Sequence, residues 1–153
     1  MSQAPAGVGV HRVDAQRGRA LRMAVLRPAQ APGEPMYASE RDPRTAHYAA
    51  LDGAGGVLAV GSVMAEAHPR EPRAGDWRVR GMATRPELRG RGLGALVLDA
   101  LERHARERGG RRAWCNARTP ARAFYERAGW SAEGEEFEIE EIGPHCLMAK
   151  PLR

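Results

Sequence analysis

The stretch "MATRPELRGRGLGALVLDALERHARERG", residues 82–109, joins an apolar, strand-like segment to a helical pattern through a loop of arginine and glycine. Within it, residues 85–94 contain three arginines and three glycines. The first amides of a helix lack intrahelical partners and lie at the positive end of the helix dipole, so a glycine-rich entry lets phosphate oxygens approach them. The loop therefore predicts a phosphate cradle. The alternative at this point is a flexible, arginine-rich turn that binds nothing.

The residues after the loop predict the clearest helix in the chain. Apolar residues recur at the spacing of one helical face, and charged residues lie mostly opposite. Gly109 and Gly110 end the pattern. His104 lies beside the apolar face near the helix end, where we expect a structural histidine. The apolar positions are Leu93, Leu96, Val97, Ala100, Leu101 and Ala105.

Strands and helices alternate along the remaining sequence, which predicts a three-layer α/β fold. The proline-rich segment 28–44 predicts a long surface loop of the kind that often belongs to a substrate site. In chain order, we expect a strand over 8–13, a helix from Asp14, the loop 28–44, a hairpin formed by 45–51 and 57–66, a strand over 77–84, the helix from Leu93, a strand over 111–117, a helix from Thr119 to Gly129, and two strands about Gly143.

Length and charge limit the classes of protein that remain. A chain of 153 residues fits one domain, which we expect to span residues 1–153. With 24 lysines and arginines against 19 acidic residues, the net charge of +5 favours an anionic partner, such as a phosphorylated cofactor, a nucleic acid or an acidic surface. Nucleic-acid binding is the weaker of these hypotheses because the sequence shows neither aromatic platforms nor a recognisable groove-reading element.

The cysteines and the apolar runs favour a cytoplasmic protein. Cys115 and Cys146 each lie in an apolar, strand-like run, which suits buried thiols in a reducing compartment better than a disulfide. Neither has metal-ligand spacing to a second cysteine or to histidine, so we expect no metal. The longest apolar run, residues 57–65, is about half of what a membrane span requires. We therefore expect no membrane partner.

Two well-known phosphate-binding motifs fit the loop less well. A P-loop needs GxxxxGK[ST], and this loop has no lysine. A dinucleotide fold needs GxGxxG or GxGxxA, which Gly90, Gly92 and Ala95 satisfy. Its acidic ribose ligand should follow about twenty residues later, where "GGRRAW" offers only basic groups. The dinucleotide interpretation stays open but lacks that residue.

The loop "RGRGLG" fits the R/QxxGxG/A pattern of the GNAT superfamily of acyltransferases, with Arg89, Gly92 and Gly94 at the defining positions. The resemblance extends beyond the loop, since "NARTPARAFYERAGW" resembles the strand, helix and terminal aromatic that follow in that family. The next segment, "GEEFEIEEIGPHCLM", resembles its ElaA-like branch. The resemblance implies a central mixed sheet of about seven strands flanked by helices, with a splayed strand pair that holds CoA.

The same resemblance implies acetyl-CoA, or another acyl-CoA, as co-substrate. The loop amides and arginine side chains would hold the pyrophosphate. Main-chain groups of the preceding strand would contact the pantetheine arm and supply the oxyanion donor. Asn116 would hold a pantetheine amide or, alternatively, cap a strand end. The implied cofactor-binding residues are Met82, Ala83, Thr84, Arg89, Gly90, Arg91, Gly92, Leu93, Gly94, Asn116, Phe124 and Tyr125.

Acyl transfer from a thioester needs a proton for the leaving thiolate and a neutral amine to attack. Tyr125 matches the tyrosine that the family commonly uses as the general acid; the alternative is a residue that only packs beside Phe124. His145 is our candidate base. The acids of the preceding segment, Glu135, Glu136, Glu138, Glu140 and Glu141, predict a solvated edge that could also attract a cationic amine, and His47 and Asp76 are outside candidates.

The sequence thus predicts an N-acetyltransferase that transfers an acetyl group from acetyl-CoA to a primary amine by direct attack. The alternative is a GNAT-like module that binds acyl-CoA without catalysis. The acceptor would be a small molecule or a peptide, and the sequence leaves a homodimer open.

Overall fold

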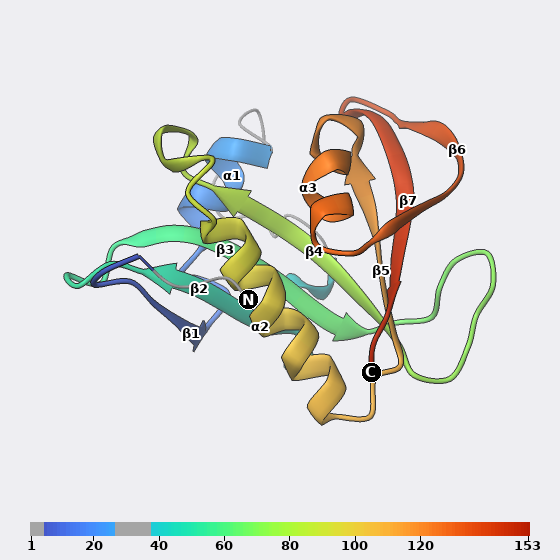
Figure 1. Ribbon diagram of the computed structural model, residues 1–153, viewed down its shortest axis with the longest axis horizontal. Helices are drawn as coiled ribbons and strands as arrows, with labels where there is room; N and C mark the ends of the chain where they lie inside the picture. Colours follow the sequence, from blue (N-terminus) through green and yellow to red (C-terminus); the bar gives the residue numbers. More distant parts are fainter. Residues whose placement is uncertain (1–4, 27–37) are drawn as a thin grey trace.

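The computed structural model describes residues 5–26 and 38–153, in which all seven strands join one sheet (Figure 1). The strand order is β1-β2-β3-β4-β5-β7-β6. Neighbours are antiparallel except β4 and β5, which are parallel, so the predicted mixed sheet is confirmed. The strands are β1 (Gly9–Val13), β2 (Ala46–Leu51), β3 (Val57–Ala65), β4 (Asp76–Thr84), β5 (Arg112–Arg118), β6 (Ser131–Ile139) and β7 (Gly143–Pro151).

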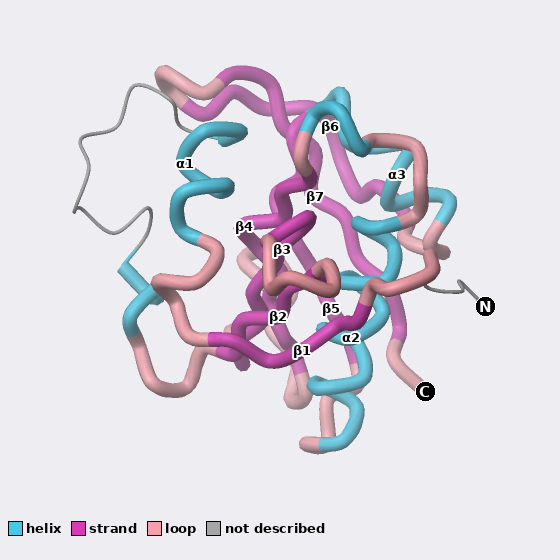
Figure 2. Tube along the Cα trace, turned by 90° about the vertical axis from the view of Figure 1, so that its left-hand side faces the viewer, coloured by secondary structure: helices cyan, strands magenta, loops and turns pink. Residues whose placement is uncertain are grey.

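Helices cover both faces of this sheet. Figure 2 shows α1 (Arg19–Leu26) on one side of the strands and α2 (Leu93–Glu107) and α3 (Arg122–Arg127) on the other. Three short 3-10 turns, η1 (Ala38–Arg41), η2 (Pro86–Leu88) and η3 (Thr119–Ala121), link the elements. The expected three-layer α/β architecture is therefore present.

The main hydrophobic core lies between the sheet and α2. Five apolar side chains of α2 are buried against apolar residues of β2 to β5 and β7. The predicted face is correct except that Leu98 is fully buried, whereas Leu96 and Ala100 are only partly covered. The buried apolar residues of the helix are Leu93, Val97, Leu98, Leu101 and Ala105.

The first helix begins later than its sequence predicts. Asp14 accepts a hydrogen bond from the Arg17 amide at 2.9 Å and so closes a turn, and α1 starts only at Arg19. Gly18 comes so close to the sheet that a β-carbon there would lie 2.4 Å from Val60 Cγ1, which favours glycine just before the helix. The predicted loop 28–44 lies mostly outside the described residues.

The central strands β4 and β5 diverge along their length (Figure 1). They pair only where Asp76–Arg78 faces Arg112–Trp114, and from there the two strands form a V. Parallel strands bond evenly while they stay adjacent, so this early end of pairing leaves the later main-chain groups of both strands facing a gap. The splayed pair expected from the family resemblance is thus present.

The two cysteines are buried free thiols, as their apolar surroundings predict. Among residues 5–26 and 38–153, no helix combines the length and the apolar character needed to cross a membrane.

Candidate functional site

A cleft of about 840 Å³ lies in the V between β4 and β5. It runs along β4 to the loop 85–94 and the start of α2, and along β5 to η3 and α3. Its size falls in the range of small-molecule sites. The splay of the sheet therefore produces a cavity with two walls. One wall is formed by β4 and the loop 85–94, and the other by β5, η3 and α3.

The loop before α2 presents helix amides to this cleft. Gly90 and Gly92 have φ of 82° and 79°, and Gly92 is the N-cap of the helix. The Leu96 amide bonds to the Gly92 carbonyl at 3.1 Å, so the amides before it are those that a helix start leaves unpaired within the helix. A β-carbon at Gly90 or Gly92 would meet no atom within 4 Å, so the left-handed backbone rather than crowding makes glycine necessary here.

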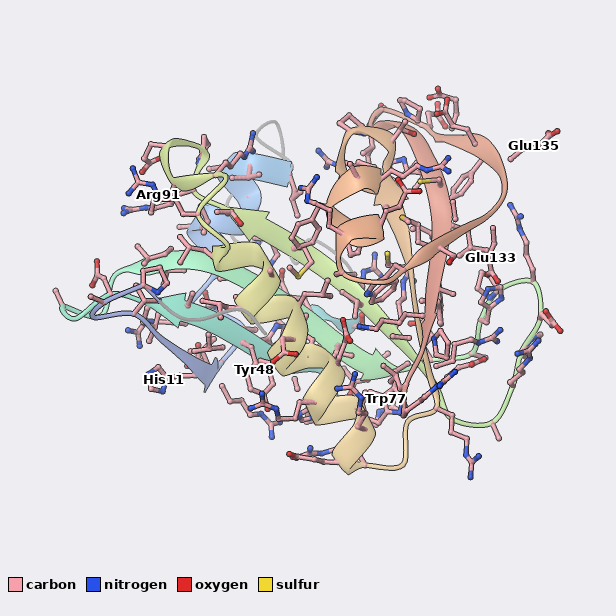
Figure 3. All side chains as sticks on the ribbon, viewed as in Figure 1. His11, Tyr48, Trp77, Arg91, Glu133 and Glu135 are labelled. Carbon is pink, nitrogen blue, oxygen red and sulfur yellow. The ribbon has the colours of Figure 1, made fainter. Side chains whose placement is uncertain are left out.

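Two arginines of the loop lie in different places. Arg89 lines the cleft together with Gly90, Gly92, Leu93 and Gly94. The exposed Arg91 is not among the lining residues, and Figure 3 shows its side chain on the outer side of the loop.

Gly94 allows the two arms of the cleft to meet at the helix start. A β-carbon at this position would lie 3.1 Å from the Phe124 ring and 3.3 Å from Thr84 Oγ1. Phe124 of α3 thus reaches across to α2, where it lines the cleft. The last glycine of the motif therefore allows close packing between α3, α2 and β4.

A β-bulge interrupts β4 where this strand lines the cleft. Val60 pairs with Ala83 and Ser62 with Arg80, so Gly61 of β3 faces both Gly81 and Met82 of β4. Gly81 has a φ of 68°, as the first residue of such a bulge often has. A bulge leaves the extra residue outside the regular ladder, so its main-chain groups can serve a ligand. Met82, Ala83 and Thr84, which we expected to contact pantetheine, all line the cleft here.

Tyr125 lies on the opposite arm, buried in the first turns of α3. Its ring packs edge to face against Phe124 and Trp130, with centroids 5.0 and 5.3 Å apart. Burial, and after it the neighbouring Cys115 thiol, raises the pKa of Tyr125 well above its ordinary value. The Cys115 thiol lies beside the Tyr125 hydroxyl, and both residues line the cleft. Tyr125 is thus a protonated phenol next to a thiol.

His145 approaches the cleft from β7. Its Nδ1 lies 2.8 Å from the Gly143 carbonyl oxygen. A carbonyl only accepts hydrogen bonds, so Nδ1 carries the proton and the neutral ring has Nε2 as its basic nitrogen. The ring is 4 % exposed, packs against Phe137 and lines the cleft.

Asn116 lies where β5 leaves β4. It lines the main cleft and also a smaller cavity of about 200 Å³ beside Phe137 and Leu147. Its position inside β5 disagrees with the alternative of a strand-end cap.

The model of the Acetyltransferase (GNAT) family matches residues 16–130. The chain belongs to the GNAT acetyltransferase family. It is 31% identical over 134 residues to the uncharacterized N-acetyltransferase YitI of Bacillus subtilis, covering 87% of this chain and 89% of that protein. The loop 85–94 of this GNAT chain is therefore not the GxGxxA turn of a dinucleotide fold.

Solved structures of GNAT proteins share its fold. Escherichia coli ElaA superposes with a TM-score of 0.73 at 16% identity, over 94% of this chain and 99% of ElaA. An aminoglycoside 6'-N-acetyltransferase complexed with coenzyme A superposes with a TM-score of 0.72 at 14% identity, over 95% of this chain and 97% of that enzyme. The superfamily prediction is confirmed. The ElaA-like branch still rests on the sequence segments, because identities this low show the fold alone.

The acidic residues that we considered near the base, on β6 and in the turn after it, are not among the described residues that line the cleft. Glu135, Glu136 and Glu138 are exposed on β6, which is an edge strand, and Figure 3 shows Glu135 directed away from the sheet. Glu140 and Glu141 lie in the turn that follows. No aspartate or glutamate is among the described residues that line the cleft. The structure therefore supports the interpretation that these glutamates lie on a solvated edge of the sheet, β6.

The two outside candidates for the base are structural. His47 is buried between Ser62 Oγ at 2.6 Å and the Glu40 carbonyl at 2.9 Å. Burial alone would raise the pKa of Asp76, but its bonds to the Arg112 side chain and to two loop amides lower this pKa to about 2. Neither residue lines the cleft.

Cys115, Arg80 and Arg118 are among the cleft residues that the sequence did not predict. Cys115 was treated only as a buried thiol, and nothing local marks its contact with Tyr125. Arg80 could have been noticed because Arg78 and Arg80 alternate in "DWRVRG", which puts both on one face of a strand. Among the described residues, no group of three histidine, cysteine or acidic side chains is arranged to hold a metal ion.

Proposed function

We propose that the protein transfers an acetyl group from acetyl-CoA to a primary amine by direct attack of the amine on the thioester. The observation that carries this proposal is the continuity of one cleft from the helix-start loop, along the bulged strand β4, to the buried hydroxyl of Tyr125. That order matches the order of pyrophosphate, pantetheine and thioester in an acyl-CoA molecule. The fold shared with an enzyme complexed with coenzyme A supports this placement.

The loop 85–94 would bind the pyrophosphate through main-chain amides and Arg89. The open space beside Gly90 and Gly92 is what a phosphate group needs to approach an N-terminal helix turn. Arg91 would then add only long-range attraction, because it lies outside the cleft lining. Gly94 and Phe124 would border the pantetheine arm where the two walls meet.

The bulge in β4 would stabilise the charge that develops on the thioester carbonyl oxygen. An oxyanion donor is effective when it is fixed before the reaction and shielded from water. Main-chain amides at Gly81 to Ala83 fulfil this condition, because the sheet on the β3 side and the Gly61 contact with Met82 hold them in place.

Tyr125 would donate its proton to the thiolate as the carbon–sulfur bond breaks. Its pKa is raised, so the phenol stays protonated at neutral pH and can protonate a thiolate of ordinary basicity. Tyr125 lines the cleft that would hold the thioester, beside the Cys115 thiol, so a sulfur that enters the cleft would lie close to its hydroxyl.

His145 would take the proton that the amine loses when the new carbon–nitrogen bond forms. An amine is mostly protonated at neutral pH, so a base must remove a proton before or during attack. The Gly143 carbonyl fixes the tautomer with Nε2 as the base. We further propose that the protein acts as one domain, residues 1–153, in the cytoplasm.

The test combines binding with turnover. Isothermal titration with acetyl-CoA should show a single site, and release of free CoA thiol should accelerate when amines from a mixed panel are added. Binding without amine-dependent CoA release on any amine of the panel would favour the alternative of a non-catalytic acyl-CoA-binding module. Absence of acetyl-CoA binding in the folded protein would contradict both.

A further inference from the structure

The main chain joins the two walls of the cleft at the closed end of the V. There Asp76–Arg78 of β4 pairs with Arg112–Trp114 of β5, and beyond this ladder the strands diverge. Tyr125 lies in α3 on one wall, whereas the bulge proposed to hold the thioester oxygen lies in β4 on the other. Side-chain contacts across the V therefore help to decide how far the general acid lies from the oxyanion donors.

The position of α3 depends on its neighbours, because the helix has only 6 residues. A helix of that length is marginal by itself, since its few hydrogen bonds do not offset the cost of starting it. Trp130 follows the helix, and its amide donates to the Tyr125 carbonyl at 3.0 Å. The two rings also pack edge to face, with centroids 5.3 Å apart. A displacement of Trp130 would thus move Tyr125.

Glu102 of α2 holds Trp130 from the other side of the V. Its side chain is 3 % exposed, whereas that of Asp99, one turn earlier, is 58 % exposed. Glu102 Oε2 accepts a hydrogen bond from Trp130 Nε1 at 3.2 Å. Its Oε1 lies 2.7 Å from Lys150 Nζ and 3.3 Å from Arg106 Nη2. Arg106 belongs to α2 itself, but Trp130 and Lys150 belong to the wall that carries α3.

Lys150 of β7 fixes the end of α3 as well. Its Nζ donates to the Ala128 carbonyl at 2.9 Å, and the last carbonyls of a helix have no partner within the helix. A β-carbon at Gly129 would lie 3.5 Å from Lys150 Cε, so the chain passes close to the lysine stem. Lys150 is the single lysine among 24 basic residues. A compact ammonium with three donors suits this site, where two acceptors lie close together.

We propose that Glu102 is a positioning residue for Tyr125. By holding Trp130 and Lys150 against α2, it fixes the width of the V where the Tyr125 hydroxyl has to reach the departing sulfur. Glu102 is not among the described residues that line the cleft, so it acts through the fold and not on a ligand. The inference rests on the proposed acetyl transfer and adds a residue that serves its protonation step.

Glu102→Gln tests this role. Glutamine keeps an oxygen for the Trp130 indole but removes the charge that binds Lys150 and Arg106, and an unpaired buried ammonium is unfavourable. We expect kcat at saturating substrates to fall about tenfold, because a small misplacement of a reacting group is costly. Isothermal titration should show that acetyl-CoA affinity is kept, since the backbone of the loop 85–94 is unchanged.

Asp99→Asn is the charge-matched control on the same helix. Asp99 is exposed and pairs with Arg103 at 3.0 Å, so its loss should leave kcat unchanged. Trp130→Phe is a milder probe in case Glu102→Gln does not fold. It keeps an aromatic ring beside Tyr125 and leaves the carboxylate with its charged partners, but removes the indole donor. It should lower kcat by a smaller factor than Glu102→Gln.

A double-mutant cycle separates positioning from a loss of stability. Glu102→Gln should lower kcat about tenfold in the unmodified protein but have no further effect in Tyr125→Phe, which has no hydroxyl to position. A loss of folded protein would instead reduce both rates by the same factor. Rates of CoA release measure the four proteins. Equal factors in the two backgrounds, or full turnover of Glu102→Gln, would overturn the inference.

Fluorine NMR tests the same contact without turnover. In CoA-saturated protein labelled with fluorotyrosine, the Tyr125 resonance is assigned by its absence from Tyr125→Phe. It should shift in Glu102→Gln and in Trp130→Phe, and stay in place in Asp99→Asn. That result in a protein that acetylates no amine would contradict acetyl transfer and keep the positioning of Tyr125 by Glu102. An unchanged resonance in Glu102→Gln and Trp130→Phe would overturn the inference.

Discussion

The glycine-rich loop 85–94 and the strand face that carries His145 are two sides of one cleft that the chain builds in different ways. The loop is one continuous segment, residues 85–94, and offers main-chain amides at a helix start. The other side consists of side chains, among them Arg80, Arg118 and His145, which come from three strands.

This difference decides how each side responds to mutation. A site made of main chain depends on backbone conformation and open space, so its glycines matter more than its exposed side chains. In a site made of side chains, each side chain makes its own contact with the ligand. A conservative substitution of one such residue should therefore affect one step of the reaction.

Tyr125→Phe should have the largest effect. The change keeps the ring packing against Phe124 and Trp130 but removes the hydroxyl beside Cys115. We expect turnover to fall by about 10²-fold or more in a step limited by chemistry, with acetyl-CoA affinity nearly unchanged. Initial rates of CoA release and isothermal titration check the two parts.

Tyr48→Phe is the matched control for that change. Tyr48, labelled in Figure 3, bonds to His104 Nδ1 at 3.0 Å and is not among the cleft-lining residues. Its loss should leave turnover near the unmodified value at a temperature where both variants are folded. Equal turnover of Tyr125→Phe and the unmodified protein would indicate that Tyr125 only packs against its neighbours and is not the general acid.

Gly92→Asp should weaken acetyl-CoA binding by more than about tenfold, or at least about 1.4 kcal/mol, because it adds bulk and negative charge where phosphate should lie. Isothermal titration measures the affinity. Gly109→Asp is the control for backbone strain, since Gly109 has a φ of 81° and equally open surroundings but lies beyond the other end of α2. Equal losses in both variants would argue against a phosphate site at Gly92.

His145→Gln should have a smaller effect on the rate, because the deprotonated fraction of the amine still reacts without a base. The informative signal is the pH profile at subsaturating amine. If His145 takes the amine proton, its contribution to the rise of kcat/KM with pH should disappear in the variant, and only the rise that follows deprotonation of the amine should remain, while acetyl-CoA affinity is kept. A uniform fall at every pH with a lower melting temperature would instead indicate that the bond to the Gly143 carbonyl is structural.

His104 should affect stability without affecting the reaction. Burial, and after it Arg108 and Arg12, lowers the pKa of His104 to about 4. Below pH 6.5 the imidazole of His104 is protonated in the unfolded chain, whereas it stays neutral in the folded protein until the pH approaches 4. The free energy of unfolding should therefore fall by about 2 kcal/mol between pH 7 and pH 5. Urea titrations at the two pH values measure this.

The control for that slope is His104→Gln, which should remove most of it and leave acetyl-CoA affinity unchanged. Burial also lowers the pKa of His47, so a residual slope of the same sign should remain. An unchanged slope in the variant would show that His104 does not titrate in this range.

Most of the fold follows from local patterns. The spacing from Leu93 to Ala105 defined α2, and glycine and proline separated the strands. Element boundaries were less predictable. The start of α1 was placed too early because the close contact of Gly18 with Val60, which delays the helix, joins segments that lie far apart in the sequence.

Sequence alone identified the family and predicted a phosphate-binding loop at residues 85–94, because a helix start and its glycines are consecutive residues. Tertiary structure alone decided the rest of the site. Strand alternation assigns Arg80 and Arg118 each to a face, but only the short β4–β5 ladder and the β5–β7 register bring them to one cleft with His145. Hydrogen bonds between distant strands fix that register, and no local pattern records them.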